Sequence, residues 1–141
     1  MIRKLIEATN RIDGSYYLAS RRLGCPENEV CFLYALSDGK KYSQKQISKE
    51  WLVPKTTVNT VFRSLEDRGL VTSETNGKEK MIILTEKGKE YSEKLLSPIR
   101  EAEKVALKKT LESYSAVFID ACSYFADRLE EELKENKYEK H

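Results

Sequence analysis

The stretch from Tyr42 to Leu84, YSQKQISKEWLVPKTTVNTVFRSLEDRGLVTSETNGKEKMIIL, decides the fold of this 141-residue chain. Its first half contains two amphipathic segments whose apolar residues are spaced three and four apart, which predicts helices. Its second half contains two apolar runs with Asn76-Gly77 between them, the strongest short signal of a β-hairpin. The order of helix, turn, helix and hairpin predicts a winged helix-turn-helix.

The second helix of this stretch has the clearest boundaries. Pro54 suits the first turn of a helix, where its missing N–H needs no partner, and Gly69 suits the left-handed residue that follows a helix end. We therefore expect a helix over residues 54–68. One apolar stripe on it should face a core, and it consists of Val58, Val61, Phe62 and Leu65.

The opposite face of this helix carries short polar side chains and one arginine. Such side chains can approach base edges in the major groove of DNA, and an arginine can bind guanine through two hydrogen bonds. On an isolated helix, a solvated face is the simpler interpretation. After a capped helix and inside a basic segment, DNA contact is favoured for Thr56, Thr57, Asn59, Thr60 and Arg63.

The first helix begins with a capping box, in which Ser43 is the cap and Gln46 returns the hydrogen bond. Ile47 and Trp51 are expected to face the core. Side chains at the starts of the two helices lie where N–H groups and cations meet DNA phosphates. Contacts that position the protein on DNA are expected from Ser43, Gln44, Lys45 and Lys55.

The hairpin is expected to be long and loose. A two-residue loop formed by Asn76-Gly77 would place Glu74 opposite Glu79, a destabilising pair of like charges. A longer wing avoids that pair. We expect Lys78 and Lys80 in this wing to contact DNA phosphates or to reach the minor groove.

The charge of the chain is distributed unevenly. The formal net charge is only +2 at pH 7, which alone does not indicate a nucleic-acid partner. Residues 40–70, however, hold seven Lys or Arg against three acidic residues, a local charge of +4. A basic segment that coincides with a helix-turn-helix is the electrostatic pattern of a DNA-binding protein.

Helices with apolar seams flank the winged region on both sides. Residues 2–22 keep an approximate helical period, and a last helix should begin between Lys109 and Ser113 and end near Leu133. A small winged domain cannot cover both seams, so a two-fold dimer is expected. The predicted fold is mainly α with a small β-hairpin wing. Its parts are N-terminal helices at 1–38, the DNA-binding winged helix-turn-helix at 39–85 and C-terminal dimerisation helices at 86–141.

Two phrases of the sequence resemble the MarR family of bacterial transcription regulators. They are Ser64-Leu65-Glu66-Asp67-Arg68-Gly69-Leu70-Val71 and Leu84-Thr85-Glu86-Lys87-Gly88. The resemblance implies a homodimer on a pseudo-palindromic operator, often a repressor that releases double-stranded DNA when a small aromatic or phenolic effector binds. Members of the family usually carry Asp-x-Arg in the wing, whereas this chain has Asn76-Gly77-Lys78-Glu79-Lys80, which lacks the planar fork of arginine.

Four aromatic residues are candidates for the border of an effector cleft between dimer helices and winged domain. Tyr, with its polar tip, suits such a position, but ordinary helix packing is the simpler interpretation for each tyrosine, and packing of the turn is the simpler one for the tryptophan. The four residues are Tyr16, Tyr17, Tyr34 and Trp51.

Three cysteines without Cys-x-x-Cys spacing argue against a disulfide framework and suit a reducing cytoplasm. Cys25 lies beside Pro26 in an expected loop, and exposure there would permit a regulator that responds to thiol oxidation. Such sensing requires an accessible thiolate of low pKa. Cys31 and Cys122 lie on helical faces and are expected to be small core residues.

The sequence offers little for catalysis. The only histidine is His141, so no internal histidine can serve as a general base, and no phosphate loop or zinc-spaced ligand set is present. We expect no enzyme activity, no cofactor and no metal. No signal peptide or membrane-spanning run is visible, so a cytoplasmic protein is expected. The main alternative is a winged-helix module that binds proteins and not DNA.

Overall fold

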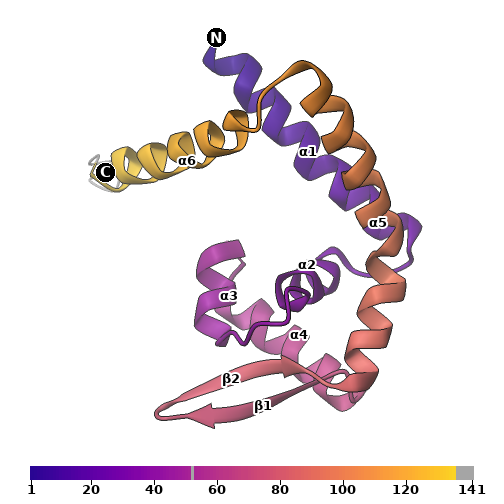
Figure 1. Ribbon diagram of the computed structural model, residues 1–141. Helices are drawn as coiled ribbons and strands as arrows, with labels where there is room; N and C mark the ends of the chain where they lie inside the picture. Colours follow the sequence, from indigo (N-terminus) through magenta and orange to yellow (C-terminus); the bar gives the residue numbers. More distant parts are fainter. Residues whose placement is uncertain (52, 136–141) are drawn as a thin grey trace. The chain divides into compact units, whose positions relative to one another are not determined.

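The computed structural model describes residues 1–51 and 53–135. In this part the chain forms six helices and one antiparallel pair of strands, which confirms the predicted mainly α fold with a hairpin wing (Figure 1). The chain divides into two compact units, Met1–Arg100 and Glu101–His141. Leu52 and residues 136–141, the end of the predicted 86–141 region, lie outside the described residues. The elements in order are α1 (Ile2–Arg22), α2 (Glu27–Leu36), α3 (Gln44–Trp51), α4 (Lys55–Asp67), β1 (Val71–Asn76), β2 (Glu79–Leu84), α5 (Glu86–Ser113) and α6 (Val117–Glu135).

The second helix of the pair, α4, has nearly the boundaries that its sequence predicts. Pro54 is the N-cap and not the first helical residue. At the other end Gly69 adopts φ +73°, its N–H donates to Glu66 O at 2.9 Å, and Leu70 N–H donates to Leu65 O at 2.9 Å. These two bonds form a Schellman motif, which needs the left-handed residue that glycine supplies without strain.

The capping box that begins α3 is present as predicted. Ser43 Oγ accepts from Gln46 N–H at 3.1 Å, and Gln46 Oε1 accepts from Ser43 N–H at 2.9 Å. Ile47 is buried, as expected. The prediction that Trp51 faces the core is wrong. Trp51 is the last residue of α3 and remains 37% exposed, with one edge against Tyr34 at 5.7 Å between ring centroids.

The hairpin is tighter than predicted. Asn76 at the end of β1 lies opposite Glu79 at the start of β2, so Gly77 and Lys78 alone form the turn. The expectation of a longer, looser wing is therefore wrong. Gly77 adopts φ +67°, and a glycine at the first position of a two-residue turn suits this tight geometry.

The position of the turn also removes the predicted charge repulsion. A turn at Asn76-Gly77 would place Glu74 opposite Glu79, but the observed turn lies one residue further along the chain. In the resulting register Glu74 lies opposite Met81, and its carboxylate forms an ion pair with Lys41. A shift of one residue thus changes which side chains face each other along the whole hairpin.

Buried apolar side chains form two clusters within Met1–Arg100. The larger cluster joins α2, α3, α4 and the hairpin, and Tyr42 adds an antiparallel bridge to Ile82 of β2, with N···O distances of 3.3 and 2.7 Å. The same core therefore supports the helix-turn-helix and the wing. The larger cluster contains Phe32, Leu33, Leu36, Ile47, Val58, Phe62, Leu65, Leu70, Val71 and Ile82, and the smaller one contains Cys25, Val30, Leu96 and Ile99.

The start of α5 lies very close to the end of α4. Thr85 Oγ1 donates to Gly69 O at 2.6 Å and accepts from Gly88 N–H at 3.0 Å, while Thr85 N–H donates to Leu70 O at 3.1 Å. A Cβ atom on Gly88 would lie 1.8 Å from Leu70 O, so no larger residue fits there. This contact requires the glycine of the Leu84–Gly88 phrase.

The second unit contains the end of α5 and α6. The last helix begins at Val117, later than predicted, because α5 continues to Ser113 and Ser115 Oγ accepts from Val117 N–H at 3.1 Å. No described side chain from residue 101 to 134 is buried. Cys122, which we expected in a core, is exposed, so that prediction is wrong.

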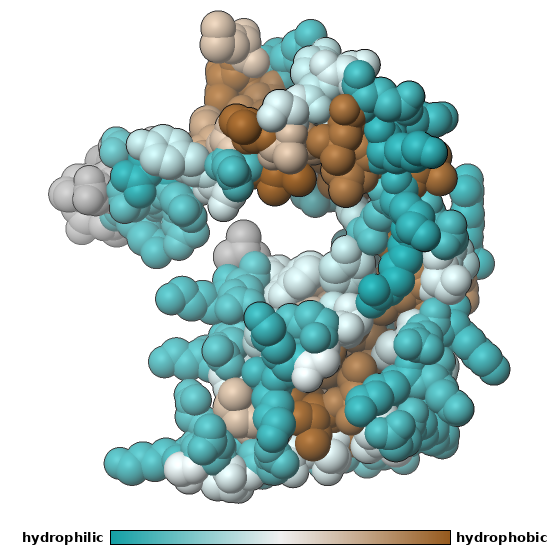
Figure 2. Space-filling view, in the orientation of Figure 1, coloured by the Kyte–Doolittle hydropathy of each residue, from teal (hydrophilic) through white to brown (hydrophobic). Residues whose placement is uncertain are grey.

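The first helix, α1, also exposes apolar side chains. Only Ser20 of its 21 residues is buried. Figure 2 shows hydrophobic side chains gathered where α1 is drawn, whereas the surface of the helix-turn-helix and hairpin is mostly hydrophilic. None of the described helices is both long and apolar enough to cross a membrane. The exposed apolar residues of α1 are Ile2, Ile6, Ile12, Tyr16, Tyr17 and Leu18.

Candidate nucleic-acid interface

The polar face of α4 lies on the surface of the winged region. Thr56, Thr60 and Arg63 are exposed, and Thr57 and Asn59 are half-buried. The Thr60 hydroxyl donates to Thr56 O at 2.9 Å, so its oxygen remains able to accept a further hydrogen bond. The five residues that the sequence singled out on this helix are therefore accessible in whole or in part.

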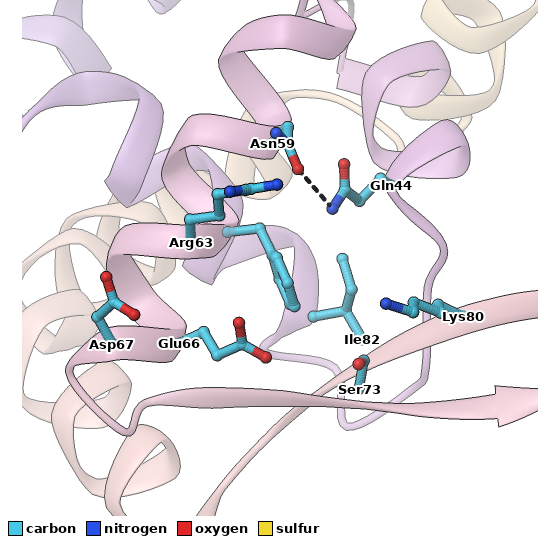
Figure 3. A pocket seen from close by; sticks show the side chains of 9 residues that line it. Gln44, Asn59, Arg63, Glu66, Asp67, Ser73, Lys80 and Ile82 are labelled. Atoms are coloured by element: carbon cyan, nitrogen blue, oxygen red, sulfur yellow. Dashed lines mark hydrogen bonds between the residues drawn. The ribbon is translucent and has the colours of Figure 1, made fainter.

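A groove runs between α4 and the wing, with a volume of about 310 Å³ (Figure 3). Its apolar floor is formed by Phe62 and Ile82. Arg63 from α4 and Lys80 from β2 supply its positive charges. Two acidic residues from the last turn of α4, one turn beyond Arg63, also line it. The remaining lining residues are Gln44, Asn59, Glu66, Asp67 and Ser73.

The starts of the two helices meet at this groove. Gln44 Nε2, in the first turn of α3, donates to Asn59 Oδ1 of α4 at a long 3.4 Å, as the dashed line in Figure 3 shows. Lys45 and Lys55 are exposed beside them. Ser43, in contrast, is buried, and its hydroxyl accepts the capping bond, so the structure does not place this side chain at the surface.

The wing places its two lysines differently. Lys78 lies in the turn, and Lys80 lies in β2 opposite Thr75. Both are exposed. Figure 3 shows Lys80 directed into the groove, because it shares a face of β2 with Ile82. Lys80 thus lines the groove, whereas Lys78 lies in the turn at the end of the hairpin.

One cation of the basic segment is used inside the molecule. Arg68, at the C-terminal end of α4, forms an ion pair with Glu29 of α2, and its Nη2 donates to the Tyr91 hydroxyl of α5 at 3.0 Å. The guanidinium also lies over the Tyr91 ring, 5.2 Å from its centroid. Burial acts to lower the pKa of Arg68, but the hydrogen bonds to Glu29 and Tyr91 raise it overall.

Sequence reasoning missed this Arg68–Glu29–Tyr91 network. Arg68 was counted only as one of the seven cations, although Glu29 was an available signal, since it is an acidic residue in a helix that is otherwise largely apolar. The two residues are 39 positions apart, which local pattern analysis does not connect.

Cys25 belongs to the same network and lacks the exposure that the oxidation-sensing alternative requires. Its side chain is 8% exposed, and its thiol donates to Glu29 Oε2 at 3.1 Å. Burial, followed by the hydrogen bond to Glu29, raises the pKa of the Cys25 thiol to about 12. Both effects disfavour the thiolate that a redox sensor needs. Cys31 is half-buried, and burial raises its pKa as well.

Three of the four aromatic candidates form a line. Tyr16 of α1 meets Tyr34 of α2 edge-on at 6.4 Å between ring centroids, and Tyr34 meets Trp51 of α3 in the same way at 5.7 Å. Tyr17 is not part of this line, and its ring lies beneath the Arg21 guanidinium instead, at 5.9 Å. The line therefore connects α1 to the helix-turn-helix.

The described residues contain no group of three or more His, Cys, Asp or Glu side chains arranged to hold a metal ion. The arrangement that remains is a polar helix face, a groove beside it, and exposed lysines at the helix starts and on the wing. Such a surface can bind a polyanion through phosphate contacts and can contact base edges.

The comparisons with known proteins agree with this arrangement. Residues 23–80 match the model of the MarR family. No curated protein matches the sequence. A MarR family regulator from Neisseria meningitidis has a similar structure, with a TM-score of 0.74 and 22% sequence identity, over 96% of this chain and 98% of that one.

Two further structures of similar fold contain ligands. A MarR family transcriptional regulator from Listeria monocytogenes, complexed with a 26mer DNA, has a TM-score of 0.65 and 18% identity over 97% of this chain and 96% of that one. NadR in complex with 4-hydroxyphenylacetate has a TM-score of 0.70 and 13% identity over 89% of each chain.

Proposed function

We propose that this chain is a MarR family winged helix-turn-helix regulator that binds operator DNA as a homodimer and represses transcription, since residues 23–80 match the model of that family. The observation that carries this proposal is the polar face of α4, on which Thr56, Thr60 and Arg63 are exposed beside a groove that Lys80 of the wing also lines. In a MarR family regulator of the same fold, a 26mer DNA is bound. The recognition helix of this proposal is α4.

Phosphate contacts supply most of the affinity in this proposal. Lys45 and Lys55 lie at the helix starts, Lys78 and Lys80 lie on the wing, and all four side chains are exposed. Lysine binds phosphate as a point charge and carries little sequence information. Sequence preference is assigned to Arg63, which suits guanine.

Asn59 is the second candidate for base contact. An asparagine side chain can bind adenine through two hydrogen bonds. Its Oδ1 accepts the long bond from Gln44, which restrains the amide before DNA arrives. Gln44 therefore supports Asn59 in this proposal, in addition to lying near a phosphate.

The dimer is proposed from the apolar side chains that the chain leaves exposed. They lie on α1, at the end of α5 and on α6, where no described side chain from residue 101 to 134 is buried. A two-fold axis between two copies covers such surfaces and presents two recognition helices to successive turns of DNA, about 34 Å apart.

A small aromatic or phenolic effector is proposed to release the DNA. NadR, which has a similar fold, binds 4-hydroxyphenylacetate. In this chain the line of Tyr16, Tyr34 and Trp51 joins α1 to the helix-turn-helix, so an aromatic ligand beside it contacts both. Such a ligand changes DNA affinity only if it binds the DNA-free arrangement more tightly.

Selection of genomic DNA fragments by the purified full-length protein tests this function. We expect a pseudo-palindromic sequence to be enriched, and the Arg63→Ala protein to bind it about 1–3 kcal/mol more weakly with a relaxed base preference. Ser64→Ala, at an exposed position of the same helix, is the matched control and should keep the preference.

Two results would contradict the proposal. Equal affinity of the Arg63→Ala and parent proteins for operator and random DNA would remove Arg63 from base recognition. Failure of the parent protein to retard any promoter fragment at micromolar concentration and moderate salt would favour the alternative, a winged-helix module that binds another protein. The acidic pair Glu66 and Asp67 beside the groove is the feature that favours this second function.

A further inference from the structure

Arg68 differs from the other cations of the basic segment in what it contacts. On α4, Arg63 lies on the polar face, whereas Arg68 lies at the helix C-cap and reaches two other helices. It pairs with Glu29 of α2 and donates to the Tyr91 hydroxyl of α5 at 3.0 Å. The backbone of the same residue is also held, since Lys87 Nζ donates to Arg68 O at 3.0 Å.

The ion-pair partner of Arg68 is the carboxylate of Glu29, which needs a cationic partner because it is largely buried. The Glu29 side chain is only 11% exposed, and its two oxygens are both used, Oε1 by Arg68 and Oε2 by the Cys25 thiol at 3.1 Å. A carboxylate in such a place loses much of its hydration, and removal of its cationic partner is strongly unfavourable. Arg68, whose side chain is 42% exposed, is therefore held by an internal carboxylate.

The same contacts fix the end of the recognition helix. The Schellman motif at Gly69 ends α4, and the bond from Thr85 N–H to Leu70 O and the close approach of Gly88 to Leu70 join this end to the start of α5. The Arg68 side chain adds a contact with α2, through a planar fork that meets Glu29 on one side and Tyr91 on the other. Two other elements, α2 and α5, thus hold α4 at the end opposite Pro54.

We propose that Arg68 is a positioning residue, which through Glu29 and Tyr91 sets the angle at which α4 presents its polar face to DNA. The proposal rests on the DNA-binding function proposed above. It implies that operator recognition depends on a carboxylate that lies away from the polar face of α4. Glu29 and Arg68 should therefore affect base preference without contributing a phosphate contact.

Replacement of Glu29 by Gln gives the sharpest test, because electrostatics and positioning predict different results. The variant loses a negative charge and leaves the charge of Arg68 uncompensated, so charge alone predicts tighter binding to every DNA sequence with the operator preference unchanged. Positioning predicts that the preference for operator over random DNA falls by about 2- to 30-fold, while affinity for random DNA is not weakened. Operator preference equal to that of the parent protein would overturn the proposal.

Variants of Arg68 distinguish a positioning role of its side chain from a direct effect of its charge on DNA binding. Arg68→Gln and Arg68→Lys should lose operator preference to a similar extent, because a lysine keeps the charge but cannot serve both Glu29 and Tyr91. Lys80→Gln, a proposed phosphate contact, should instead reduce the slope of log affinity against log salt by about 1. Arg22→Gln, an exposed arginine of α1, is the matched charge control. Full operator preference in Arg68→Lys, or a slope change in Arg68→Gln like that of Lys80→Gln, would overturn the proposal.

Hydrogen exchange without DNA tests the structural half of the proposal independently. The amides of Arg68, Gly69 and Leu70, which bond to Ser64, Glu66 and Leu65, should exchange at least about tenfold faster in folded Glu29→Gln and Arg68→Gln than in the parent or in Arg22→Gln. Unchanged exchange in both variants would overturn the positioning role. A parent protein that binds no DNA, with faster exchange in the variants, would refute the proposed function and leave Arg68 as the residue that fixes α4.

Discussion

The winged region and the second unit of this protein differ in where their apolar side chains lie. In the winged region, ten residues from α2, α3, α4 and the hairpin form one buried cluster. From residue 101 to 134 no described side chain is buried, although the helices there carry as regular an apolar seam. The first region can thus be stable within one chain, whereas in the proposed dimer the partner covers the apolar side chains of the second, since most helical stability comes from tertiary packing.

The largest expected effect follows from a cavity in the buried cluster. Leu65 is 0% exposed, and Leu65→Ala should lower the free energy of unfolding by about 2–5 kcal/mol at every protein concentration. Leu129→Ala, at a 39% exposed position of α6, is the matched comparison. Its effect should be seen only where a dimer forms, so urea denaturation at two protein concentrations distinguishes the variants. If both variants lost a similar free energy of unfolding at every protein concentration, the proposed difference between the two regions would be wrong.

The second expected effect is on assembly. A carboxylate at the exposed apolar seam of α6, in Phe118→Asp, should raise the dissociation constant of the dimer by roughly 10- to 100-fold, because an unpaired charge would be buried in the interface. Ser123→Asp adds the same charge to the opposite face of the helix and should leave the dimer intact. Sedimentation velocity measures both. A dimer that persists in Phe118→Asp with parental affinity would place the interface elsewhere.

The third prediction compares the reaction rates of two cysteines, one from each region. In the Phe118→Asp protein at about pH 8, Cys122 should react with iodoacetamide at least about tenfold faster than Cys25. Cys122 is exposed, whereas Cys25 is buried and the pKa of its thiol is raised to about 12, so the thiolate is scarce well below that pH. Mass spectrometry of the labelled peptides separates the two sites. Rapid labelling of Cys25 would restore the oxidation-sensing hypothesis.

Local signals predicted the parts of the fold that depend on a few neighbouring residues. The end of α4 follows from Gly69, and the start of α3 follows from the reciprocal bonds of Ser43 and Gln46. These features were predicted correctly because each is a property of three or four consecutive positions. The polar face of α4 was also predicted, since helical period alone determines which side chains share a side.

Features that depend on distant partners were not predicted. A loose hairpin was expected because a turn at Asn76-Gly77 places Glu74 opposite Glu79, whereas a one-residue shift gives Glu74 different neighbours, among them Lys41. The burial of Cys25 depends on α5, more than sixty residues further along the chain. In both cases the deciding contact joins separate elements, and periodicity contains no information about it.

The tight turn of the wing has a consequence for how its lysine can change over evolution. Side chains alternate between the two faces of a strand, so Lys80 faces the groove because it stands two residues before the buried Ile82. A single residue inserted between them would turn the ammonium group to the outer face while the composition and charge of the wing remained almost the same. Whether the number of positions from the lysine to Ile82 is even or odd therefore decides whether its ammonium group can enter the groove beside α4. The mere presence of a basic residue in the wing does not.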